Sequence, residues 1–129
     1  MNTQTDQTYA DFLNATDALA ENLACSEPIV AYHNARAQLD ADDQAQTLLQ
    51  QLGQLQSEIR ASQARGPVTQ ADIENFRAVQ REAQTNPTII NFALTQQAAV
   101  EYLREINQSI SQLLGVDFAA LARPSGGCC

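Results

Sequence analysis

The chain of 129 residues has no tryptophan and no lysine, and only 5% of its residues are aromatic. A β-sandwich or barrel needs aromatic and β-branched side chains in its strands, and Gly or Pro in its many turns. Five Gly and four Pro offer few such turns. Alanine and glutamine, which favour helices, occur 21 and 17 times. The composition therefore predicts an all-helical protein.

Positive charge is equally scarce, because seven arginines stand against 15 acidic residues and leave a formal net charge of −8. Direct binding to nucleic acid or to an anionic membrane depends on clustered basic side chains, so we expect neither. The sequence has no cationic and apolar leader pattern and no apolar run approaching roughly 18 residues. We expect a cytoplasmic protein whose residues 1–129 form a single domain.

Apolar residues recur at alternating spacings of three and four, which is the helical period. The pattern predicts helices over about residues 8–24, 27–39, 44–64, 70–85 and 87–114. It leaves open whether the second and third are one kinked helix. Helix starts are expected at Ser26, Thr69 and Asn86, and Gly115 is expected to end the last helix. We predict an antiparallel helical bundle of four to five helices, two of them long.

The last predicted helix is about 42 Å long, whereas a globule of this size is about 30 Å across. Only the helix over residues 44–64 approaches that length, so part of the apolar seam has no expected partner within the chain. We predict that the protein forms a homodimer through this seam. The seam residues assigned to the interface are Ile89, Phe92, Leu103, Ile106, Ile110 and Leu113.

No P-loop, GxGxxG, HExxH, GxSxG or CxxC motif is present, so we expect no enzymatic activity. The one histidine, His33, should lie at the edge of a buried helix face. Asp40, Asp42 and Asp43 suit capping of the following helix better than binding of a hard metal ion.

Four arginines gather around the turn at Gly66 and Pro67, and two interpretations stay open. They form a docking patch for an acidic partner, or a solvated face paired with nearby acidic side chains. The residues of this arginine patch are Arg60, Arg65, Arg77 and Arg81.

The three cysteines are chemically unusual for a chain whose core needs no disulfide. Cys25 is expected to be a small buried side chain. Cys128 and Cys129 end a tail, about residues 122–129, that is expected to be mobile. These two suit ligation of a soft metal or an iron–sulfur cluster completed by a second chain, and a redox pair or lipidation are the alternatives.

Two segments resemble the bacterial YlbF/YmcA family: AYHNARAQLDADDQAQTLLQQLGQLQ at residues 31–56 and INQSISQLLGVDFAALARPSGGCC at residues 106–129. The stripe from Tyr32 to Leu39, the acidic step before Ala45, the TNP start at residues 85–87 and the Gly-Gly-Cys end carry the resemblance. The resemblance implies a small cytoplasmic helical regulator without enzymatic activity.

Members of that family form the Y-complex with YaaT, which directs RNase Y in mRNA maturation and affects competence, sporulation and biofilm formation. The resemblance thus implies a second copy, related Y-complex proteins and RNase Y as partners. It also implies a 4Fe–4S cluster shared between chains, with Cys128 and Cys129 as the matching tail cysteines. A cluster-dependent redox or oxygen sensor is the alternative function.

Overall fold

The computed structural model describes residues 3–117 and residue 120. Within them the chain forms five helices and no strand, which confirms the predicted fold class. The helices are α1 (Thr3–Ala24), α2 (Glu27–Ala41), α3 (Asp43–Gln63), α4 (Gln70–Thr85) and α5 (Pro87–Leu114). None of these helices is long and apolar enough to cross a membrane.

The helix ends follow from local side chains. Asp42 has extended backbone, with φ −97° and ψ 95°, and its carboxylate accepts a hydrogen bond from the Ala45 amide at 3.0 Å, so α2 and α3 are two helices. Thr69 caps α4 and Asn86 caps α5 in the same way. Gly115 ends α5 in the left-handed conformation at φ 71°. These predicted ends are confirmed.

Ser26 is the N-cap residue of α2 as predicted, with φ −69° and ψ 144°, but its side chain does not make the expected capping bond. Its hydroxyl donates to the Leu23 carbonyl at 2.6 Å and makes no capping bond to α2. The hydroxyl therefore satisfies the carbonyl end of α1 instead of the amide end of α2.

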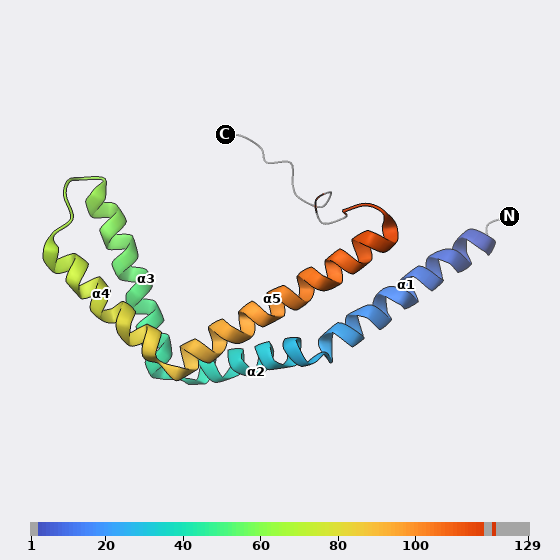
Figure 1. Ribbon diagram of the computed structural model, residues 1–129, viewed down its shortest axis with the longest axis horizontal. Helices are drawn as coiled ribbons and strands as arrows, with labels where there is room; N and C mark the ends of the chain where they lie inside the picture. Colours follow the sequence, from blue (N-terminus) through green and yellow to red (C-terminus); the bar gives the residue numbers. More distant parts are fainter. Residues whose placement is uncertain (1–2, 118–119, 121–129) are drawn as a thin grey trace.

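The five helices make two arms that diverge from a common junction (Figure 1). In one arm α3 lies against α4, and in the other α2 lies against α5. Beyond α2, α1 extends toward the far end of α5, and it adjoins α2 at the turn between the two helices.

The buried side chains gather at the junction. They come from the second half of α2, the start of α3, the end of α4 and the first half of α5, namely Ala35, Leu39, Ala45, Leu48, Ala83 and Ala99. Four of these six residues are alanines, whose small side chains allow the helices to approach closely. The Thr88 hydroxyl donates to the Asp42 carboxylate at 2.6 Å and ties α5 to the corner between α2 and α3.

The first helix differs from its prediction. It begins at Thr3, five residues before the expected start, and with 22 residues it is one residue longer than α3. The expectation that only one other helix approaches α5 in length is therefore wrong. Residues 3–7 were missed because they are all polar and carry no apolar period.

Candidate protein-interaction surface

The predicted interface seam on α5 divides into two halves. In the first half, Phe92 packs against Tyr32 of the same chain with ring centroids 5.7 Å apart, and Ile89 lines a groove with α3. In the second half, Ile106 and Ile110 are half-buried, whereas Leu103 and Leu113 are exposed. The second half of the seam therefore has the exposed apolar surface that a contact with another chain needs. The homodimer is still a prediction.

An apolar groove of about 310 Å³ runs between α2 and α5. Ile29, Tyr32, His33, Gln96, Ala99, Val100 and Leu103 line it. His33 is exposed at its rim, with its ring 5.6 Å from that of Tyr32, so it lies at the edge of the packed face as expected. The groove presents a largely apolar surface, because its lining is aliphatic and aromatic apart from one imidazole and one amide.

A second apolar groove, of about 380 Å³, lies at the junction where α3, α4 and α5 meet. It is lined by Leu49, Leu52, Gln80, Ala83, Gln84, Ile89, Ile90, Ala93 and Leu94. Leu94 is 62% exposed at its edge. This groove was not predicted, since its lining comes from three helices that no single periodic pattern connects.

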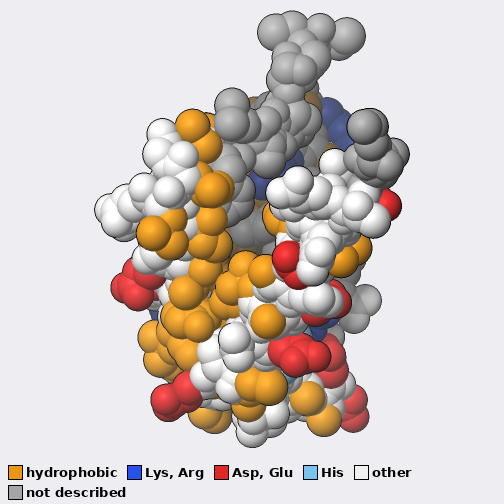
Figure 2. Space-filling model, turned by 90° about the vertical axis from the view of Figure 1, so that its right-hand side faces the viewer, with side chains coloured by type: hydrophobic (Ala, Val, Ile, Leu, Met, Phe, Trp, Pro, Cys, Tyr) orange, Lys and Arg blue, Asp and Glu red, His pale blue; other side chains and the backbone are white. Residues whose placement is uncertain are grey.

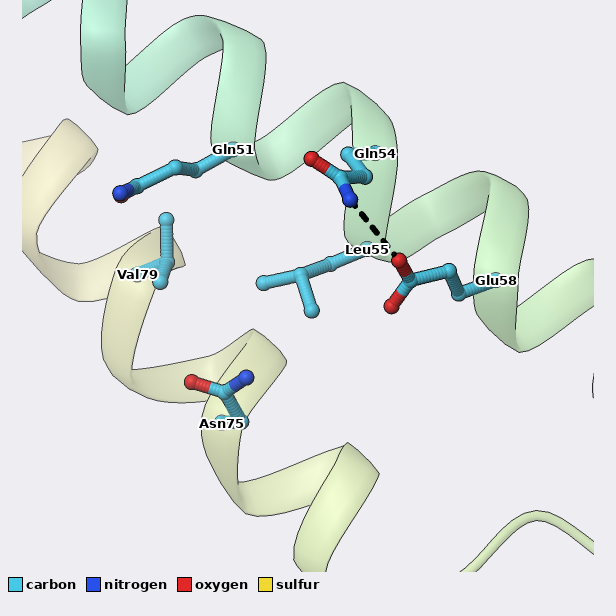
Figure 3. Close-up of a pocket in the computed structure, with 6 residues that line it drawn as sticks. All are labelled: Gln51, Gln54, Leu55, Glu58, Asn75 and Val79. Carbon is cyan, nitrogen blue, oxygen red and sulfur yellow. Dashed lines mark hydrogen bonds between the residues drawn. The ribbon is translucent and has the colours of Figure 1, made fainter.

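A third hollow, of about 240 Å³, lies between α3 and α4 (Figure 3). Leu55 reaches from α3 toward Asn75 and Val79 on α4. Glu58, the one ionisable residue of the six that line the hollow, accepts a hydrogen bond from the Gln54 side chain at 3.0 Å. Amides and aliphatic groups dominate this lining, which is a surface for contact and not a set of groups for proton transfer.

Asp42 and Asp43 lie at the start of α3 as expected, whereas Asp40 lies within α2. Asp42 caps α3, and the hydrogen bond from Thr88, together with the Ala45 amide, lowers the pKa of the Asp42 carboxyl. Asp40 pairs with Arg36 at 3.5 Å on the surface. The pKa of the Arg36 guanidinium is raised mainly by Tyr32 and, to a smaller extent, by Asp40. Among the described residues, no group of three or more His, Cys, Asp or Glu side chains is placed to hold a metal ion.

The arginine patch is exposed at all four of its positions, Arg60, Arg65, Arg77 and Arg81. In the part of the chain that the structure describes, the one ion pair is that of Arg36 with Asp40. None of the four arginines therefore forms an ion pair with a described acidic residue, and docking of an acidic partner is still a prediction. The guanidinium groups of the patch stay available to a partner.

The cysteine predictions have different outcomes. Cys25 is exposed at the end of α1, so its expected burial is wrong. The chain turns there between two helices, and no described residue covers the thiol. Cys128 and Cys129 lie outside the described residues. The described part of the chain therefore offers no set of ligands that fits an iron–sulfur cluster.

Comparison with known proteins places these features in context. A family model described as "Control of competence regulator ComK, YlbF/YmcA" matches residues 12–114. The chain is also similar to UPF0342 protein LBA1592 of Lactobacillus acidophilus, with 25% identity over 100 residues. That alignment covers 77% of this chain and 86% of its relative. No solved structure matches.

Proposed function

This chain belongs to the YlbF/YmcA family, described as control of the competence regulator ComK, and we propose that it is a regulatory adaptor without enzymatic activity. In this proposal it acts in the cytoplasm with related Y-complex proteins and modulates mRNA processing by RNase Y. Competence, sporulation or biofilm development respond as a consequence.

The observation that carries the proposal is the kind of surface the chain exposes. Two apolar grooves of about 310 and 380 Å³ open on the surface beside exposed aliphatic side chains. Surfaces of this kind bind protein segments, because burying their apolar area drives association. The acidic net charge of −8 favours proteins over RNA as the molecules that are bound.

The test is to delete the gene in its host and to map the ends of transcripts that RNase Y processes. We expect unprocessed precursors to accumulate as they do without RNase Y, and to disappear when the gene is restored. The purified protein alone should leave the same transcripts intact. Normal maturation in the deletion strain would refute the role in processing, and cleavage by the purified protein would refute the role of adaptor.

The alternative function, an iron–sulfur sensor, depends on the terminal cysteine pair. Anaerobic purification of the wild type and of a variant with Cys128→Ser and Cys129→Ser separates the two. A broad absorption band near about 400 nm with bound iron and sulfide, lost in the variant, favours the sensor. An adaptor that works through its helix faces keeps its effect on transcripts when both cysteines are replaced.

A further inference from the structure

Among the described helices, α1 is the one without a buried residue. Four of its apolar side chains nevertheless share one face, because two of them follow Tyr9 by three and four residues and Leu19 lies two turns after Phe12. We call this face the α1 stripe: Tyr9, Phe12, Leu13 and Leu19. Tyr9 is 64% and Phe12 66% exposed. A helix of this kind is stable in water only when its apolar face is covered.

The described helices leave large apolar side chains open to solvent, among them Leu94 at 62%, Leu113 at 87% and Leu114 at 61%. An obligate dimer covers roughly 1,000–2,500 Å² on each chain. Two copies therefore have enough surface to cover one another's open faces.

A matching uncovered surface lies on α5 of the same arm. Val100 and Leu103 are 42% and 44% exposed on the wall of the groove between α2 and α5. Viewed from the end where α1 begins and α5 ends, hydrophobic side chains form a continuous band on the molecule (Figure 2). Because both surfaces belong to one chain, a two-fold axis pairs each with its counterpart in the second copy.

Charge distinguishes between the two ways in which such copies can meet. α1 carries four acidic residues and no basic one, and Asp6 and Asp17 lie one turn from Tyr9 and Leu13. Pairing α1 with α1 would therefore bring carboxylates together. Arg104, beside Leu103 on α5, is exposed and forms no ion pair with any described residue. Contact between α1 and α5 places Arg104 beside the apolar contact and near the acidic side chains of α1, whereas Glu101 and Glu105 lie farther around α5 from Val100 and Leu103.

We propose that α1 is an interface helix whose stripe packs against Val100 and Leu103 on α5 of a second copy of this chain. Each of two copies then supplies one α1 and receives the other. This arrangement does not depend on the proposed role in mRNA processing. It adds α1 to an interface that the sequence assigned to α5 alone.

The first test is the mass of the full-length protein in solution, measured by light scattering after gel filtration and by sedimentation. We expect a dimer for the wild type and at least about tenfold weaker association for Phe12→Glu, because the new charge would be buried in an apolar contact. Ala18→Glu adds the same charge on the opposite face of α1 and should remain dimeric. A monomeric wild type, or a Phe12→Glu protein as dimeric as the control, overturns the proposal.

The second test does not rely on a disruptive variant. The three natural cysteines are replaced by serine, Phe12→Cys is introduced into one tagged copy, and Leu103→Cys is introduced into a copy with a different tag. Mild oxidation of the mixture should yield a disulfide-linked dimer that carries both tags. Linkage of Phe12→Cys copies to one another would show α1 paired with α1 and overturn the proposed contact.

A single chain that carries both Phe12→Cys and Leu103→Cys completes the test. Oxidation should again link two copies. A disulfide within one chain would mean that α1 folds onto its own α5, and the absence of any disulfide would mean that the two helices do not meet. Either result overturns the proposal.

Discussion

The junction and α1 are built from similar residues, but they relate differently to the rest of the chain. At the junction, four helices bury Leu39, Leu48 and four alanines, and a hydrogen bond joins Asp42 to Thr88 across 46 positions of sequence. α1 is as regular a helix, yet it buries no residue. Helical periodicity therefore decides where a helix forms, while contacts between distant segments decide which helices the single chain stabilises.

The largest difference in the free energy of unfolding should appear when a leucine is replaced by alanine at the junction and on α1. Leu39→Ala removes a buried side chain at the junction and should lower the free energy of unfolding by about 2–4 kcal/mol. Leu13→Ala on α1 should lower it by less than about 1 kcal/mol, since this side chain is 44% exposed.

Both variants should be measured by urea unfolding in the Phe12→Glu background, so that association between copies does not add to the result. Equal losses at the two positions would show that α1 is packed as firmly as the junction.

A smaller effect with a defined pH dependence is expected at Asp42. The Thr88 hydroxyl and the Ala45 amide lower the pKa of Asp42 in the folded protein. A carboxyl whose folded pKa lies below its unfolded value, about 3.9, adds stability above that value and loses it as the pH falls through the folded pKa. Asp42→Asn should therefore destabilise the protein near neutral pH, and the difference from the wild type should shrink below about pH 4.

The control for this measurement is Asp43→Asn, which removes the adjacent exposed carboxylate and leaves the contact with Thr88 in place. Thermal unfolding of the three proteins between about pH 3 and pH 7 gives the comparison. A difference between Asp42→Asn and the wild type that stays constant over this range would mean that the charge of Asp42 does not stabilise the junction.

Most helix ends could be predicted because their causes are local. Asn86 satisfies amides two and three residues ahead, and Gly115 adopts a positive φ that other residues avoid. The start of α2 at Ser26 was also predicted, but not the bond of its side chain, because a hydroxyl between two helices can bond to either of them and the sequence does not say which.

The surfaces could be predicted only in part, because they depend on which helices meet. Phe92 was assigned to an interface between chains, but its ring packs on Tyr32, which lies 60 positions earlier in the sequence. Cys25 was expected to be buried because free cysteines usually are. In the described residues, however, no helix covers the turn where it lies. The groove edged by Leu94 combines α3, α4 and α5 and has no single sequence pattern.

A still smaller effect on stability is expected in the arm opposite α1. Arg77→Glu with Arg81→Glu should change the free energy of unfolding by at most about 0.5 kcal/mol, because both side chains are exposed and neither pairs with a described residue. If the arginine patch docks an acidic partner, the double variant should capture less of the Y-complex proteins from cross-linked cells. Arg36→Glu is the control outside the patch, and an equal loss of capture with it would point to net charge instead of docking.

The least effect on the junction should come from removing most of α1. Deleting residues 1–20 keeps Leu23, whose carbonyl accepts hydrogen bonds from the amide and hydroxyl of Ser26, so the start of α2 is undisturbed. The shortened chain should unfold with the same free energy as the monomeric Phe12→Glu protein, because the deleted residues bury nothing at the junction. It should also have lost self-association. Matching unfolding with lost association would mean that α1 serves contacts between copies, whereas a fall in stability of several kcal/mol would mean that α1 supports the fold of its own chain.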